Sequence, residues 1–178
     1  MSVEVLRSEI VYTGRAFEVR RDCLRWPNGH TADVDIVDHP GAVTLVPLDE
    51  LGQVWMVRQY RHSAGQVLLE LPAGTLEPGE DPMVCAAREC REETGMAAAR
   101  LIPLGEAFLA PGYSTEYMYF YLALGLTPAP LEGDPDEQLQ VERVPVPALG
   151  ERIASGDLRD AKSLAALYLA GERLANPG

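Results

Sequence analysis

"GTLEPGEDPMVCAARECREETGM", residues 74–96, contains a predicted helix that places like charges side by side. A helix turns about 100° per residue, so residues three and four positions apart share a face. Glu89 therefore stands beside Glu92 and Glu93, and like charges at that spacing cost roughly 0.2–0.5 kcal/mol per pair. Gly95 is the predicted end of the helix, so Glu92 and Glu93 lie in the last turn, where the macrodipole disfavours anions. Two broken local rules at one place indicate a functional cluster of carboxylates.

The same segment carries the start signals of the helix. Asp81 is a plausible N-cap, and Pro82 suits the first helical position. The apolar stripe of this helix, which lies nearly opposite the three glutamates, consists of Met83, Ala87, Cys90 and Thr94. We therefore expect one face to pack inward and the other to gather carboxylates. The alternative interpretation is a solvated face, on which Arg88 and Arg91 soften the repulsion.

The whole chain has 178 residues and a formal net charge of −12, which argues against duplex nucleic acid as a partner. No apolar run approaches the roughly 20 residues of a membrane span, and the first ten residues lack the apolar block of a signal peptide. We therefore expect a cytoplasmic protein without a membrane partner. The three cysteines form no CxxC pair, so a disulfide scaffold or a zinc cluster is not expected.

The remaining segments alternate between strand and helix patterns without a strict βαβ rhythm, which predicts an α/β fold with a mixed sheet between helices. A break at His39-Pro40-Gly41 separates a small N-terminal antiparallel β unit, residues 1–39, from a main domain, residues 40–178. Strands are expected at residues 3–12, 17–25, 31–37, 42–47, 53–60, 67–71, 101–108, 115–124 and 139–146, and further helices at 147–155 and 161–175.

The spacing of the polar residues resembles the Nudix hydrolase motif, Gx5Ex7REUxEExGU, in which U is a bulky aliphatic residue. The seven fixed positions are occupied by Gly74, Glu80, Arg88, Glu89, Glu92, Glu93 and Gly95. Cys90 at the first U is the single departure, and it bears on packing rather than on chemistry. The resemblance implies a Nudix-type α/β/α sandwich that hydrolyses a phosphoanhydride with Mg²⁺ or Mn²⁺. It also implies metal ligands, namely the carboxylates of Glu89, Glu92 and Glu93 and the backbone carbonyl of Ala73, and a Glu80–Arg88 pair.

The resemblance extends beyond the motif to the ADP-ribose pyrophosphatase branch. The segment VRQYRHSAGQVLLELPAG, residues 57–74, is similar to that branch and implies substrate contacts from Arg58, Arg61 and Glu70. A proline 16 residues after Gly95 (111 − 95) resembles the ADP-ribose signature and adds Pro111, Gly112 and Tyr113. The acidic segment DPDEQLQVE, residues 134–142, is similar to a late loop of the branch. It implies that Glu137 activates water, with Glu92 as the other catalytic candidate.

Three functions remain open on these grounds. The first is hydrolysis of ADP-ribose to AMP and ribose 5-phosphate, and the second is the same chemistry on another nucleoside diphosphate sugar or a dinucleotide. The third is a domain that binds a nucleotide without cleaving it, which the complete set of motif carboxylates disfavours. A two- or three-stranded β unit is barely stable alone. We therefore expect a homodimer in which residues 1–39 pack on the partner subunit, as the resemblance also implies.

Overall fold

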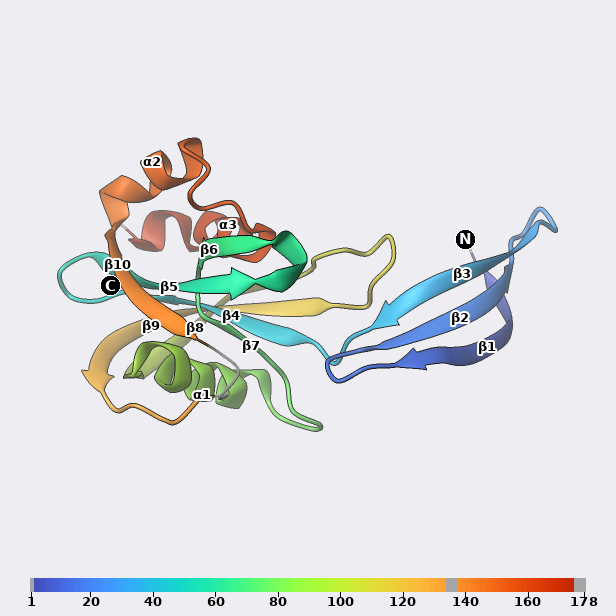
Figure 1. Cartoon of the computed structure of the whole chain (residues 1–178), viewed down its shortest axis with the longest axis horizontal. Helices are drawn as coiled ribbons and strands as arrows, with labels where there is room; N and C mark the ends of the chain where they lie inside the picture. The colour runs from blue at the N-terminus through green and yellow to red at the C-terminus, as the bar shows by residue number, and fades with distance from the viewer. Residues whose placement is uncertain (1, 134–137, 175–178) are drawn as a thin grey trace. The chain divides into compact units, whose positions relative to one another are not determined.

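The computed structural model describes residues 2–133 and 138–174. The chain forms two compact units (Figure 1). The first consists of Met1–Gly41 and Phe108–Tyr117, and the second of Ala42–Ala107 and Met118–Gly178. The segment at residues 108–117 joins the first unit although it lies far along the chain, and nothing in the local sequence pattern indicates that.

The first unit is built on an antiparallel sheet of β1 (Glu4–Thr13), β2 (Glu18–Arg25) and β3 (Thr31–Asp38). The β2–β3 hairpin turns at the expected Pro-Asn-Gly sequence, where Gly29 adopts a left-handed conformation. Inside the sheet Asp22 is buried and paired, since it accepts hydrogen bonds from Ser8 and Arg20. By contrast, all ten residues of β1 are exposed.

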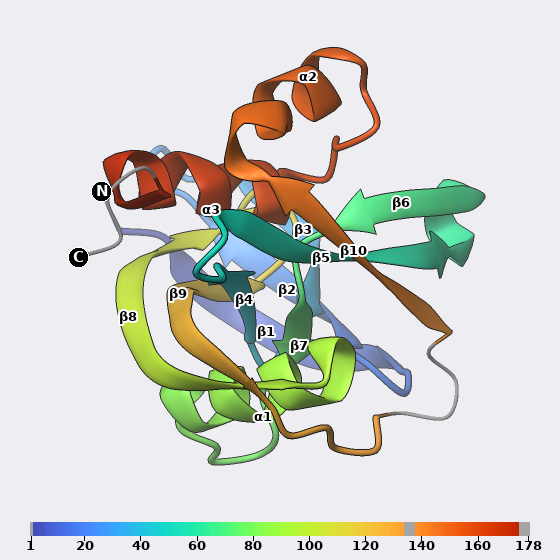
Figure 2. The same ribbon diagram turned by 90° about the vertical axis from the view of Figure 1, so that its left-hand side faces the viewer.

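The second unit contains two sheets with helices on both sides. One is a mixed sheet in the order β7-β4-β9-β8, in which β4 runs parallel to β9 and antiparallel to β7, and the other has the order β10-β5-β6. Figure 2 shows α1 on one side of these strands and α2 and α3 on the other, which confirms the expected α/β/α arrangement. The strands are β4 (Ala42–Pro47), β5 (Gln53–Arg61), β6 (Gln66–Glu70), β7 (Ala73–Thr75), β8 (Met96–Phe108), β9 (Tyr117–Pro128) and β10 (Leu139–Pro145). The helices are α1 (Pro82–Thr94), α2 (Leu149–Ala154) and α3 (Ala161–Ala170), with short 3₁₀ turns at His62–Ala64, Val146–Ala148 and Gly171–Leu174.

The core of this unit lies around β4, whose six residues are all buried. Strand β4 is buried on both faces because α1 contacts it and α3 contacts it as well. On the α1 side, the small side chains of Cys85, Ala86 and Cys90 pack against Val43 and Leu45. None of the helices within residues 2–133 and 138–174 is long and apolar enough to cross a membrane.

The inward face of α1 differs from the predicted stripe. Met83 and Ala87 are exposed, so the prediction was wrong for these two residues, although Cys90 and Thr94 are buried as expected. Residues buried on α1 are Cys85, Ala86, Glu89, Cys90, Glu93 and Thr94. Two of the glutamates therefore belong to the packed face instead of the face opposite to it. The physical reason is tertiary, because β7 lies against α1 and covers that side of the helix.

Several predicted boundaries also differ. Strand β8 begins directly after Gly95 and not at residue 101, and the loop before α1 contains the short strand β7, which was not predicted. The predicted helix at 147–155 is a 3₁₀ turn followed by α2. The last helix ends at Ala170 instead of continuing to residue 175, because Gly171 interrupts it.

Candidate active site

The ends of α1 are fixed by local chemistry. The Asp81 side chain accepts hydrogen bonds from the backbone N–H groups of Met83 (2.8 Å) and Val84 (3.4 Å), and Pro82 occupies the first turn. Gly95 adopts a left-handed conformation (φ 74°) and its N–H bonds to the carbonyl of Arg91. Both caps lie where the sequence predicts them, so the register of the glutamates on the helix is determined by the sequence itself.

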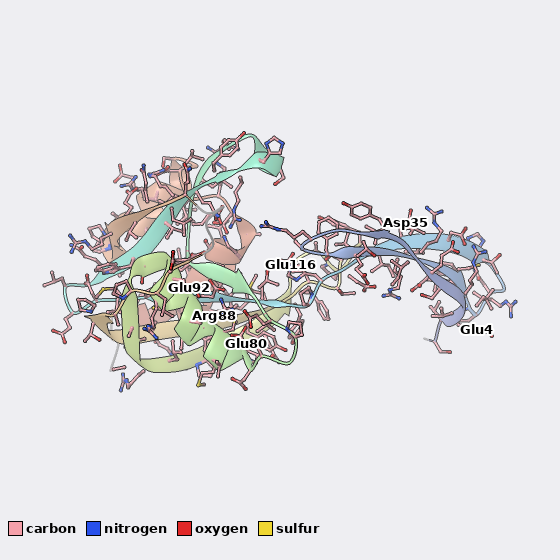
Figure 3. The ribbon with its side chains drawn as sticks, turned by 60° about the horizontal axis from the view of Figure 1, so that its bottom comes forward. Glu4, Asp35, Glu80, Arg88, Glu92 and Glu116 are labelled. Carbon is pink, nitrogen blue, oxygen red and sulfur yellow. The ribbon has the colours of Figure 1, made fainter. Side chains whose placement is uncertain are left out.

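Arg88 is the cation that offsets the repulsion between the glutamates. Its Nη1 donates to Glu89 Oε1 at 2.6 Å and to Glu92 Oε2 at 2.8 Å. Its Nε and Nη2 donate to the two carboxylate oxygens of Glu80, at 3.1 and 3.0 Å. Figure 3 shows Glu80, Arg88 and Glu92 gathered at α1. The hydrogen bonds from Arg88 lower the pKa of Glu80 to about 2, so Glu80 is an anion that anchors the loop to the helix.

Gly74 is required because Glu89 occupies the space that a side chain would need. A Cβ atom on Gly74 would lie 1.8 Å from Glu89 Oε1 and 1.9 Å from its Cδ. Next to it, the backbone N–H of Ala73 donates to Glu93 Oε2 at 3.1 Å. Glu89 and Glu93 are only 7% and 5% exposed. Strand β7 therefore forms a cradle for two buried carboxylates.

This cradle fits a hard divalent cation. Carboxylate and carbonyl oxygens are the ligands that Mg²⁺ and Mn²⁺ prefer, and Glu89, Glu92, Glu93 and Ala73 supply only such atoms. Among the described residues, however, no three acidic, histidine or cysteine side chains already converge into a complete cage. Arg88 bonds to Glu89 and Glu92, so a metal ion would compete with the guanidinium for these two carboxylates. The donor set fits the metal once Arg88 Nη1 releases both glutamates.

We predict that Gly74→Ala weakens the binding of Mn²⁺ by at least about tenfold, because the new Cβ displaces the Glu89 carboxylate. The affinity is measured by calorimetric titration with Mn²⁺. The matched control is Gly150→Ala in α2, where a Cβ meets nothing within 4 Å and the backbone does not require glycine. Equal affinity of both variants for Mn²⁺ would contradict the assignment of Glu89 as a ligand.

The two arginines expected to contact substrate each lie against carboxylates. Arg58 donates to Glu142 at 2.6 Å and to both oxygens of Asp157 at 3.0 Å. Arg61 donates to both oxygens of Glu70 at 2.9 and 2.7 Å. The carboxylate partners of Arg58 were not predicted, because they lie 84 and 99 residues away along the chain.

Glu70 is 2% exposed at the end of β6, and it is held between two cations. Burial by itself would raise the pKa of Glu70, but the hydrogen bonds and charges of Arg61 and Lys162 outweigh burial and lower that pKa. Glu70 is therefore an ionised carboxylate inside the protein. Its partner Lys162 is a residue that the sequence did not single out.

Pro111, Gly112 and Tyr113 form a turn in the first unit. The Tyr113 N–H donates to the carbonyl of Ala110 at 3.1 Å, and the Tyr113 carbonyl accepts from the Val37 N–H at 2.8 Å. The Tyr113 side chain is exposed. This turn accordingly presents an aromatic ring on the surface of the first unit.

Glu137 lies outside the described residues. Gly133, which ends the described part of the preceding loop, lies beside the cluster of glutamates. A Cβ on Gly133 would be 3.8 Å from the Cβ of Glu92. Earlier in the same loop, the Ala129 carbonyl accepts a hydrogen bond from Arg91 Nε at 2.9 Å, which holds this part of the loop on α1.

The comparisons with known proteins agree with this geometry. The model of the NUDIX domain matches residues 38–167. The chain belongs to the NUDIX family. Within that family it is 46% identical to the ADP-ribose pyrophosphatase of Mycobacterium tuberculosis over 124 residues, which are 69% of this chain and 60% of that protein. It is 31% identical to the ADP-ribose pyrophosphatase of Bacillus subtilis over 166 residues, covering 92% of this chain and 90% of that protein.

A solved structure extends the likeness to nearly the whole of this NUDIX protein. A crystal structure of an ADP compounds hydrolase superposes with a TM-score of 0.88 at 28% sequence identity. The superposition covers 100% of this chain and 97% of the other. The family assignment and the fold are thus supported by sequence and by structure independently.

Proposed function

We propose that this NUDIX protein is a metal-dependent pyrophosphatase that hydrolyses ADP-ribose to AMP and ribose 5-phosphate. The observation that carries the proposal is the cradle in which Gly74 leaves room for the buried Glu89 carboxylate beside Glu92 and Glu93. The choice of substrate is supported by two relatives named ADP-ribose pyrophosphatase. A binding domain without hydrolysis is disfavoured, since every carboxylate of the motif is present.

Glu89, Glu92, Glu93 and the Ala73 carbonyl would hold Mg²⁺ or Mn²⁺ in this proposal. Such a cation neutralises phosphate charge, polarises a phosphoryl oxygen and lowers the pKa of a bound water. Arg88 Nη1 must then leave Glu89 and Glu92, while Glu80 keeps Arg88 Nε and Nη2. Glu80 thereby retains the arginine at the site when its bonds to the other two glutamates are broken.

Glu137 is proposed to orient or deprotonate the attacking water. The three helix glutamates are committed as metal ligands, so a separate base is useful. The proposal is supported by Gly133, a described residue four positions earlier in the chain, which lies beside Glu92. Glu92 is the alternative catalytic residue.

The substrate contacts are proposed to come from Arg58, from Arg61, which Glu70 holds through two hydrogen bonds, and from the turn of Pro111, Gly112 and Tyr113. The guanidinium fork of Arg61 matches the geometry of phosphate oxygens. The exposed Tyr113 ring offers a flat apolar surface of the kind on which an adenine stacks. The net charge of −12 disfavours duplex nucleic acid as a partner.

Product analysis tests the proposal. ADP-ribose incubated with the protein and Mg²⁺ should yield equal amounts of AMP and ribose 5-phosphate, and chelation by EDTA should stop the reaction. Recovery of intact ADP-ribose in the presence of Mg²⁺ would refute the proposed activity.

The proposed location is the cytoplasm, a reducing compartment in which Cys23, Cys85 and Cys90 stay as the free thiols observed here.

We also propose a homodimer in which residues 1–39 pack on the partner subunit. The exposed apolar side chains of the N-terminal segment are Val3, Val5, Leu6, Ile10, Val11 and Tyr12. Exposed apolar side chains along this segment support a contact with a partner. Light scattering at micromolar concentration should therefore give twice the chain mass of 19.4 kDa.

The dimer should also respond to a charge on β1. Ile10→Asp is expected to weaken the dimer, because it places a carboxylate among the apolar side chains of β1. Leu51→Asp is the matched control, since Leu51 is an exposed leucine in the second unit. A wild-type monomer in light scattering would count decisively against the homodimer.

A further inference from the structure

Lys162 breaks two local rules at the start of α3. It is the second residue of the helix, where the macrodipole disfavours a cation. Its side chain is only 12% exposed, and a lysine is rarely buried unless it is paired. Both costs have to be offset by specific partners, so a particular role is expected for this lysine.

The partners of Lys162 connect α3 to the end of β6. Lys162 Nζ donates to Glu70 Oε2 and, at 2.9 Å, to Asp160 Oδ1. The next residue of the helix, Ser163, accepts a hydrogen bond from the backbone N–H of Leu71 at 2.7 Å. The first turn of α3 is therefore docked on Glu70 and on the residue that follows it.

Glu70 lies between two cations of different exposure. The Arg61 side chain is 37% exposed and the Lys162 side chain is 12% exposed. Glu70 itself is 2% exposed and has both oxygens bonded to Arg61. Lys162 holds Glu70 from one side and Arg61 bonds to it from the other, so Lys162 limits the movement of the carboxylate that orients Arg61. Glu70 also fixes the plane of the guanidinium through two parallel hydrogen bonds.

The position of this group places it near the carboxylate cradle. Ala73 follows Glu70 by three residues, and three residues span at most about 11 Å. We propose that Glu70 and Lys162 are positioning residues, which hold Arg61 in place to bind an anionic phosphate group of the diphosphate substrate. The inference rests on the proposed pyrophosphatase function and adds Lys162, a residue of the C-terminal helix, to the means of substrate recognition.

The test compares Lys162→Met with Lys162→Arg and Ser163→Ala. Lys162→Met should raise KM for ADP-ribose about tenfold and change kcat by less than about twofold, because Glu70 loses the bond that holds it in place to orient Arg61 for binding. Lys162→Arg should restore most of the affinity. Ser163→Ala removes only the bond to Leu71, so it is expected to lower the melting temperature without raising KM. If Lys162→Met is poorly folded, Lys162→Gln, which keeps a donor but no charge, replaces it.

A double-mutant cycle with Arg61→Met decides whether Lys162 acts through Arg61. The KM of the double variant should equal that of Arg61→Met alone, because Lys162 has no arginine to position once Arg61 is replaced. An unchanged KM in Lys162→Met, or an equal rise in Ser163→Ala, would overturn the inference. So would an effect of Lys162→Met that persists in full when Arg61 is replaced.

Binding of inorganic pyrophosphate separates this inference from the proposed function. In calorimetry with Mg²⁺ present, Lys162→Met should weaken pyrophosphate binding about tenfold, and Arg61→Met should abolish the difference. If this pattern holds while ADP-ribose is not cleaved, the proposed function fails and the positioning role stands. If ADP-ribose is cleaved while pyrophosphate binds equally to wild type and Lys162→Met, the positioning role fails.

Discussion

Glu93→Gln is expected to lower kcat for ADP-ribose by at least about 100-fold while the protein stays folded. Glu93 is buried, and its Oε2 accepts the hydrogen bond of the Ala73 N–H. A glutamine keeps an oxygen acceptor for that N–H and removes only the negative charge. The expected loss therefore reports on the binding of the metal and not on the packing of α1.

Three measurements separate these effects. Turnover of ADP-ribose should fall, Mn²⁺ affinity should fall with it, and the melting temperature of the metal-free protein should not decrease, because mutual repulsion is relieved. Glu151→Gln provides the matched control, as Glu151 is an exposed helical glutamate on α2. Turnover near the wild-type value in Glu93→Gln would rule out the metal assignment.

Glu137→Gln is expected to reduce kcat by about 10²–10⁴, the usual contribution of a general base. KM should change little, because the interaction is made mainly in the transition state. Steady-state kinetics with ADP-ribose and Mg²⁺ measure both constants. The prediction is based on the described residues of the preceding loop, which contact α1. Arg91 donates a hydrogen bond to the Ala129 carbonyl, and Gly133 lies beside Glu92.

Glu132→Gln is the control for this variant, because Glu132 is an exposed glutamate in the same acidic loop. It should leave both kcat and KM near the wild-type values. If kcat were unchanged in Glu137→Gln, the general base would have to be one of Glu89, Glu92 and Asp136.

Features determined by neighbouring residues were accessible from the sequence. The N-cap at Asp81 and the stop at Gly95 depend on contacts within a few residues, and both lie as predicted. The Glu80–Arg88 pair, which the resemblance to the Nudix motif implies, spans only eight residues and is present in the structure. The same holds for the β2–β3 hairpin, whose turn residues have a local reason for their conformation.

Features determined by tertiary packing were not accessible. The buried face of α1 includes Glu89 and Glu93 because β7 covers it, and a periodicity that counts glutamate as polar places them outside. The pair of Lys162 with Glu70 joins residues 92 apart, and the pair of Arg58 with Asp157 joins residues 99 apart. For the Lys162–Glu70 pair, the sequence does offer one indication. Lys162 lies in the first turn of a predicted helix, where the macrodipole disfavours a cation, so a specific partner is expected.

The specificity constant tests the central claim most directly. Values of kcat/KM should be measured with Mg²⁺ for ADP-ribose, GDP-mannose and a dinucleotide, since this chain is also 31% identical to a GDP-mannose pyrophosphatase of Yersinia pestis over 139 residues. We expect ADP-ribose to give the highest kcat/KM and to yield AMP and ribose 5-phosphate. A sugar nucleotide or dinucleotide cleaved at least about tenfold better, a difference of about 1.4 kcal/mol in transition-state stabilisation, would contradict the choice of substrate.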